Sequence, residues 1–151
     1  MICIHYGHKK FTPSLWQDVS TRLDCWIKPH GGLWTSPVKC KYGWKQWCKE
    51  EDFNTNKLKI SFKLKLKPDA KICLIDSYTD LAKLPFIPHP LFKKIGSDRQ
   101  LLDFETLARQ YDAIYLTIKG EQETRFAKPT LYGWDCESVF IMNQNCFTVI
   151  K

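Results

Sequence analysis

The clearest pattern in the chain is an alternation of apolar and polar residues from Lys57 to Lys67. Because side chains two residues apart in a strand point to the same face, the pattern predicts one long strand with a buried face and an outward lysine row. Base-stacking aromatics are absent from the lysine face, which favours a solvated surface, and a nucleic-acid phosphate track is the alternative. The apolar positions are Leu58, Ile60, Phe62, Leu64 and Leu66.

Shorter apolar runs predict further strands. They cover residues 1–6, 33–35 closed by Pro37, 71–76, 113–117, 139–142 and 147–150. Helical spacing predicts a helix over 42–51, whose stripe of Trp44, Trp47 and Cys48 is typical of a core-facing surface rather than a ligand site. A second helix is expected over 103–111, beginning at Asp103.

The region between these elements is rich in turn-forming residues. Thr79 or Asp80 is expected to cap a short turn of helix before Pro85, and residues 85–100 are expected to form a partly docked loop. Many short strands and a few short helices, without regular alternation, are typical of an α+β domain. We therefore expect residues 1–151 to form a single domain in which two small sheets pack on each other.

Composition indicates which partners and which cell compartment to expect. A net charge of +7 favours encounter with anionic macromolecules, including nucleic acid or an acidic protein surface. The seven cysteines are odd in number and contain no C-x-x-C spacing, which argues against a closed disulfide set or a zinc ribbon and favours the cytoplasm. The four histidines show no metal-ligand spacing, so no metal site is expected. The chain contains no run of eighteen apolar residues, so no membrane span is expected.

Three short segments carry the candidate chemistry: His5 on the first strand, the stretch 31–37, and the stretch 132–138. In the last, Asp135 and Glu137 are two residues apart, so both carboxylates are expected on one face at a strand entrance, in a cleft lined by aromatic residues. A solvated strand end is the alternative. Cys136 is expected to point to the opposite face into the core, and a cysteine nucleophile there is the other interpretation.

Together, these segments resemble the ADP-ribosyltransferase superfamily. The resemblance implies an α+β fold of split antiparallel sheets with a few short helices, and NAD as a substrate from which ADP-ribose passes to a protein or nucleic-acid acceptor. It implies Glu137 as the catalytic acid, since a carboxylate facing the ribose stabilises the positive charge that develops when the nicotinamide bond breaks. It places Asp135 where the acceptor is selected.

The resemblance also implies a set of cofactor-binding residues. The histidine holds NAD, the serine with its threonine neighbour lines the nicotinamide pocket, the paired glycines let the backbone approach the pyrophosphate, and a tryptophan stacks on a planar ring. These residues are His5, Gly31, Gly32, Trp34, Thr35, Ser36 and Trp134.

Two of these residues have plainer interpretations. His5 could be a hydrogen-bonded core histidine, and Ser36 with Pro37 could simply end a strand. A function of another class therefore stays open. In it, the chain is a non-catalytic binding or inhibitor module, as in small accessory proteins of the phage or plasmid type. Such a module would use the aromatic cleft or the 57–67 lysine face to hold an anionic partner or a nucleotide.

Overall fold

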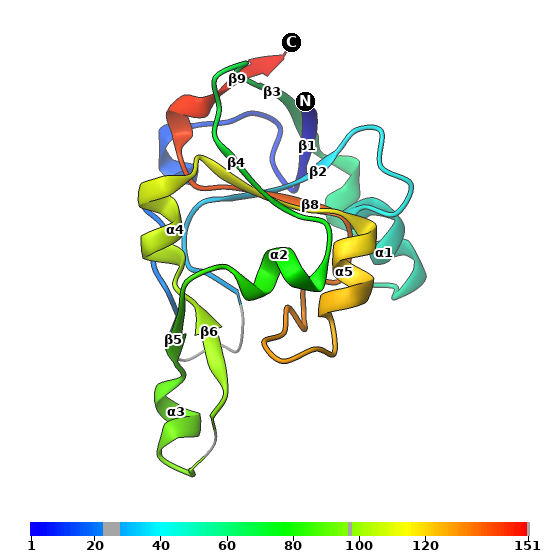
Figure 1. Ribbon diagram of the computed structural model, residues 1–151. Helices are drawn as coiled ribbons and strands as arrows, with labels where there is room; N and C mark the ends of the chain where they lie inside the picture. The colour runs from blue at the N-terminus through cyan, green and yellow to red at the C-terminus, as the bar shows by residue number, and fades with distance from the viewer. Residues whose placement is uncertain (23–27, 97, 151) are drawn as a thin grey trace.

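The computed structural model describes residues 1–22, 28–96 and 98–150. Within them a seven-stranded mixed sheet runs in the order β4-β7-β8-β2-β1-β3-β9, and β5 pairs with β6 in a separate hairpin (Figure 1). The strands of the large sheet are β1 (Ile2–Tyr6), β2 (Leu33–Pro37), β3 (Ser61–Leu66), β4 (Ile72–Ile75), β7 (Ala113–Leu116), β8 (Ser138–Ile141) and β9 (Phe147–Ile150). The α+β class is confirmed.

The arrangement of the strands differs from the expected pair of small packed sheets. Strand β2 pairs with β1 on one side and with β8 on the other, so the two halves of the sheet are continuous. The pair β4 and β7 is parallel, whereas the other neighbours are antiparallel. Hydrophobic periodicity predicts that strands exist but not which strands pair, so the expectation of a split, wholly antiparallel arrangement was wrong in this respect.

Both faces of the sheet are covered around β8. Phe140 belongs to one hydrophobic cluster, together with Ile75 and Ile114. Its neighbours Val139 and Ile141 belong to a second cluster on the opposite face of the sheet. Helices α2 (Tyr78–Ala82) and α5 (Ile118–Thr124) lie below the sheet in the view of Figure 1, and α4 (Phe104–Gln110) lies at its left side. Burial on both faces explains why the 139–142 segment is an unbroken apolar run rather than an alternating one.

The alternating 57–67 segment forms a shorter strand than expected. Residues Thr55–Lys59 make a 3₁₀ turn, η2, and β3 begins only at Ser61. Within β3 the prediction is confirmed, because burial alternates residue by residue with Phe62, Leu64 and Leu66 inside. The turn follows Asn54, whose φ of 50° is left-handed, and this local geometry leaves no trace in the hydrophobic pattern.

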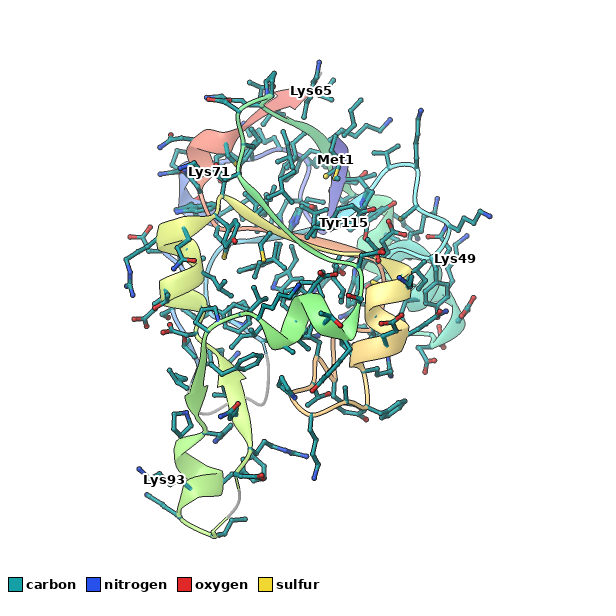
Figure 2. All side chains as sticks on the ribbon, in the orientation of Figure 1. Met1, Lys49, Lys65, Lys71, Lys93 and Tyr115 are labelled. Atoms are coloured by element: carbon teal, nitrogen blue, oxygen red, sulfur yellow. The ribbon has the colours of Figure 1, made fainter. Side chains whose placement is uncertain are left out.

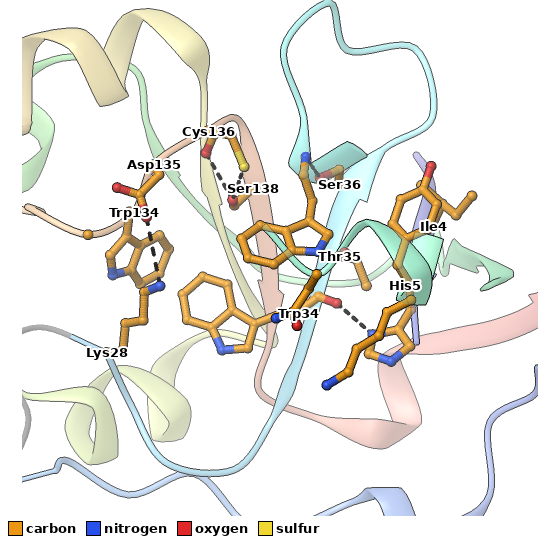
Figure 3. Close-up of a pocket in the computed structure, with 15 residues that line it drawn as sticks. Ile4, His5, Lys28, Trp34, Thr35, Ser36, Trp134, Asp135, Cys136 and Ser138 are labelled. Atoms are coloured by element: carbon orange, nitrogen blue, oxygen red, sulfur yellow. Dashed lines mark hydrogen bonds and ion pairs between the residues drawn. The ribbon is translucent and has the colours of Figure 1, made fainter. Parts of the chain in front are cut away.

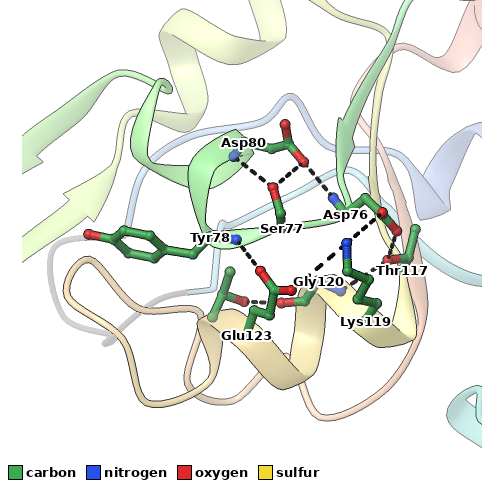
Figure 4. Close-up of polar contacts among 9 residues, drawn as sticks. Asp76, Ser77, Tyr78, Asp80, Thr117, Lys119, Gly120 and Glu123 are labelled. Carbon is green, nitrogen blue, oxygen red and sulfur yellow. Dashed lines mark hydrogen bonds and ion pairs between the residues drawn. The ribbon is translucent and has the colours of Figure 1, made fainter.

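Helix α2 begins after Ser77, not after Thr79 or Asp80 as expected. The Ser77 hydroxyl accepts from the Asp80 backbone N–H at 3.3 Å, and the Asp80 carboxylate accepts in return from the Ser77 hydroxyl and the Asp76 N–H (Figure 4). Asp80 thus closes a reciprocal cap instead of starting one. The same network reaches α5, whose N-cap residue Thr117 donates to the Asp76 carboxylate at 2.6 Å.

The expected loop over 85–100 is a small structured hairpin. Strands β5 (Phe86–Pro88) and β6 (Gln100–Leu102) pair antiparallel and carry the short helix α3 (Pro90–Lys93), and the unit projects away from the large sheet (Figure 1). Lys93 lies at its tip, while Lys49, Lys65 and Lys71 point outward elsewhere (Figure 2). The positive charge is therefore spread over the surface rather than confined to the β3 face.

Candidate functional site

A cavity of about 380 Å³ lies where β1, β2, the loop before β8, α1 (Trp44–Glu50) and η2 meet (Figure 3). The sequence-predicted segments around His5, Ser36 and Asp135 all contribute to its wall. Its lining residues are Ile4, His5, Tyr6, Lys28, Trp34, Thr35, Ser36, Trp44, Asn54, Lys57, Gly133, Trp134, Asp135, Cys136 and Ser138.

Aromatic rings form much of this wall. Trp34 is half-buried, and its ring meets the edge of Trp134 at a centroid distance of 4.5 Å and Phe140 at 4.8 Å. Trp134 itself is only 1% exposed, because it packs between Trp34 and Phe104. Of the two tryptophans expected to stack on a ligand, Trp34 is therefore the accessible one, and Trp134 serves as its support.

Ser36 positions a third tryptophan. Its hydroxyl accepts from the backbone N–H of Trp44 at 2.9 Å, so a side chain from β2 caps the first residue of α1. Gly43 permits this approach, since a Cβ there would lie 2.9 Å from the Ser36 Cβ and 2.5 Å from the Cys40 Sγ. The buried hydroxyl of Ser36 thus fixes the start of a helix beside the cavity.

The α1 stripe is less buried than the sequence predicts. Cys48 is fully buried, but Trp44 and Trp47 are half-buried and stack on each other at 5.0 Å. Trp44 lines the cavity. The core interpretation therefore holds for Cys48 and was wrong for Trp44, whose ring is accessible from the cavity side.

Charged groups approach the cavity from two sides. Asp135 pairs with Arg125 at 3.1 Å and with the Lys28 ammonium at 3.9 Å. The same ammonium lies 5.9 Å from the centre of the Trp34 ring, and Lys57 reaches the cavity from η2. Because Asp135 faces two cations, its charge is compensated and the mouth of the cavity keeps a positive balance.

His5 is anchored within the sheet. Its Nδ1 bonds the Trp34 carbonyl at 2.8 Å, and its Nε2 lies 2.9 Å from the Nδ1 of His8, whose ring stacks on it. Since a carbonyl only accepts, His5 Nδ1 carries the proton and Nε2 accepts from His8. Burial lowers the pKa of His5 below 6.5, although the bond to Trp34 opposes the shift.

Glu137 lies outside the residues that line the cavity. Its carboxylate, in a residue 9% exposed, accepts from the Tyr115 hydroxyl at 2.6 Å. Tyr115 and Thr35 both pair with Val139, so they share the sheet face opposite to that of Trp34 and Phe140. Burial, and then the bond to Glu137, raises the pKa of Tyr115.

The two carboxylates therefore do not project together as expected. Strand β8 begins at Ser138, so the two-residue period of a strand does not apply to Asp135 and Glu137. Thr35, the expected partner of Ser36, also lines the cavity, but its hydroxyl donates to the Val139 carbonyl at 2.7 Å. The structure brings His5, Trp34, Thr35, Ser36, Trp134 and Asp135 to one cavity and leaves Glu137 outside its lining.

The paired glycines have a packing explanation. A Cβ on Gly31 would lie 2.3 Å from the Asp18 carbonyl oxygen, and one on Gly32 would lie 2.4 Å from the Phe140 ring. Both have positive φ, and neither lines the cavity. They let the chain turn tightly into β2 against its neighbours.

Cys136 is buried, as expected. Burial raises the pKa of its thiol to about 12, and its sulfur lies 3.6 Å from the Ser138 hydroxyl. A thiol held in its protonated form is a poor nucleophile, which disfavours the cysteine-enzyme interpretation. Across the part of the chain that the structure describes, no group of three or more metal-ligating side chains converges.

Lys28, Trp44, Asn54 and Lys57 complete the cavity but are absent from the sequence-predicted site. They come from three separate segments, since Asn54 is the N-cap residue of η2 and Lys57 lies within that turn, so no spacing in the sequence connects all four. Among the described helices, none is long and apolar enough to cross a membrane. Comparisons with protein-family models, with curated proteins and with solved structures found no match to this chain.

Proposed function

We propose that this protein is a binding module that holds a nucleotide in the tryptophan cavity. One observation carries the proposal: two half-buried tryptophans, Trp34 and Trp44, and two lysines, Lys28 and Lys57, line the same cavity of about 380 Å³. That volume lies at the lower end of small-molecule pockets and suits a mononucleotide or one half of a dinucleotide.

The aromatic wall supports recognition of a flat ring. Trp34 is held from behind by Trp134 and Phe140, so its orientation is fixed before any ligand arrives. Trp44 is fixed by the Ser36 cap and by its stack on Trp47. Rings that are already immobilised lose little conformational entropy on binding a base, and such stacking contributes about 1–3 kcal/mol per base.

The basic groups support recognition of a phosphate. Lys28 and Lys57 both line the cavity, and the carboxylate of Asp135 is already compensated by Arg125 and Lys28. An anionic ligand that reaches the mouth therefore meets a positive balance of charge, which speeds encounter as well as binding.

The transferase function implied by the ADP-ribosyltransferase resemblance is the second candidate. The convergence of His5, Ser36 and Trp34 on one cavity favours it, and NAD would be its nucleotide. The residues fit this cofactor in part: the rings and lysines suit nicotinamide and phosphate, but the carboxylate in the cavity wall is Asp135 rather than Glu137. Binding without turnover is therefore the better-supported function.

Calorimetric titration with adenosine monophosphate, NAD, adenosine and inorganic phosphate tests the proposal. We expect the nucleotides to bind more tightly than either fragment. Lys57→Gln should weaken nucleotide binding roughly threefold to tenfold, as for a charge contact worth about 1 kcal/mol. Lys59→Gln is the matched control, since Lys59 lies in the same turn but outside the lining. Failure of every nucleotide to bind would refute the proposal.

A nicotinamide-release assay separates the two candidates. Binding of NAD without release supports the binding module. Release that Glu137→Gln abolishes would instead support the transferase and place the catalytic group on the opposite sheet face. Release that only Asp135→Asn abolishes would assign the role to the carboxylate in the cavity.

A further inference from the structure

A second concavity, of about 620 Å³, lies between the projecting hairpin and the loop after α5, and is hereafter the hairpin groove. The hairpin and this loop extend to the same end of the molecule (Figure 1). The groove and the tryptophan cavity share no lining residue, and the ion pair of Arg125 in the groove with Asp135 in the cavity connects them. The groove residues are Phe92, Ile95, Asp98, Arg99, Gln100, Arg125, Phe126, Ala127, Lys128, Pro129, Thr130 and Tyr132.

Large apolar side chains are unusually exposed here. Phe126 is 80% exposed, Ile95 is 76% and Tyr132 is 52%, and all three line the groove. They come from both walls, since Ile95 lies on the hairpin and the other two on the loop. Clustered exposed apolar side chains on a folded domain mark an interaction surface more often than isolated ones do.

Basic groups accompany the apolar ones. Arg99, Arg125 and Lys128 line the groove with a single acidic residue among its lining, Asp98, and the adjacent hairpin tip carries the exposed Lys93 and Lys94. Arg125 already pairs with Glu121 and Asp135, so the positive balance of the edge comes from the other basic groups. The guanidinium groups lie against rings, with Arg99 4.6 Å from the Phe92 centroid and Arg125 5.6 Å from that of Tyr132. A groove of this kind presents flat apolar platforms edged by positive charge.

We propose that the hairpin groove docks an acidic segment of a partner protein that carries an apolar anchor residue. Charge complementarity selects the carboxylates, which pair with the basic edge, and the exposed Phe126 and Ile95 receive the anchor between them. A peptide suits the groove better than a nucleic acid, because the aliphatic side chain of Ile95, 76% exposed, offers an apolar contact but no ring on which a base could stack.

Selection from a displayed random peptide library on the full-length protein tests this docking. We expect the enriched peptides to be acidic and to share one large apolar residue. A fluorescein-labelled enriched peptide should bind by anisotropy with an affinity that falls as salt rises. Phe126→Ser should weaken it on the order of tenfold, as for a central anchor contact.

Controls keep the result interpretable. Val149→Ser removes an apolar side chain that is 45% exposed on β9, away from the groove lining, and should leave binding unchanged. Lys128→Glu should weaken binding, whereas Lys71→Glu should not. Enrichment of basic peptides, equal binding by Phe126→Ser and wild type, or binding only of a labelled oligonucleotide would each overturn the proposal.

Discussion

Replacing Ser36 by alanine should reveal whether this residue supports α1 or contacts a ligand. The substitution removes the oxygen that accepts from the Trp44 N–H at 2.9 Å, at a position 3% exposed. Loss of a helix cap costs about 1 kcal/mol, and an unpaired buried N–H costs about 1–3 kcal/mol. We therefore expect a loss of about 1–2 kcal/mol in the free energy of unfolding.

The assay is urea denaturation followed by tryptophan fluorescence and by circular dichroism. At a urea m-value of about 2 kcal/mol/M, the transition midpoint should fall by roughly 0.5–1 M. Ser61→Ala is the control, since Ser61 is exposed on β3. An unchanged midpoint would refute the capping role. If nucleotide binding were lost while the midpoint stayed unchanged, Ser36 would instead be a direct ligand contact, as the resemblance implies.

Three further predictions concern stability. Gly32→Ala should lower the free energy of unfolding by about 3 kcal/mol or more in thermal or urea denaturation, because its Cβ would lie 2.4 Å from the Phe140 ring. The control Gly96→Ala, also at positive φ but with open space around it, should lower it by about 1–2 kcal/mol. Equal losses would contradict the packing explanation. The lowered pKa of His5 means that the unfolded chain takes up a proton near pH 6.5 that the folded chain resists, so stability should be full above that pH and fall as the pH drops below it. In pH-dependent urea titrations, His5→Gln should flatten this fall and the exposed His30→Gln should not. Asp103→Ala should cost about 1 kcal/mol in the same unfolding assay, because its carboxylate accepts from the Thr106 N–H at 2.9 Å, and an effect no larger than that of Asp69→Ala would show that the cap is unimportant.

The sequence predicts elements well where one physical signal dominates. Phe62, Leu64 and Leu66 alternate with lysines, and they are buried in β3 as predicted. The helix beginning at Asp103 follows from its side chain, which caps α4 as expected.

Helix α5 escaped prediction because its buried positions are not apolar. Gly120, Glu121 and Thr124 face inward, so from Lys119 onward the helix carries no apolar stripe that would predict it. Gly120 lets the helix approach β4 so closely that a Cβ would lie 2.1 Å from the Ile75 carbonyl oxygen. Glu121 is compensated by Arg125 at 2.8 Å. The close backbone approach at Gly120, rather than an apolar stripe, lets this helix pack on the sheet, and the ion pair within the helix compensates the buried Glu121 charge.

The candidate site was predictable only in part. His5, Trp34, Ser36 and Asp135 line one cavity, as the three sequence segments that contain them suggest. The different position of Glu137 depends on where β8 begins, and sequence periodicity fixes strand ends poorly. The basic and aromatic residues from α1 and η2 come together only through tertiary packing.

The most direct test of the central claim is a titration of the ¹⁵N-labelled protein with adenosine monophosphate, following the tryptophan indole N–H signals by NMR. Saturable shifts should be largest for Trp34 and Trp44, which line the cavity, and small for Trp16, which lies outside the lining. In Lys57→Gln, the same signals should reach half of their maximal shift at a higher nucleotide concentration. If the indole signals of Trp34 and Trp44 stay unmoved, or all indole signals move alike, the tryptophan cavity is not a nucleotide site.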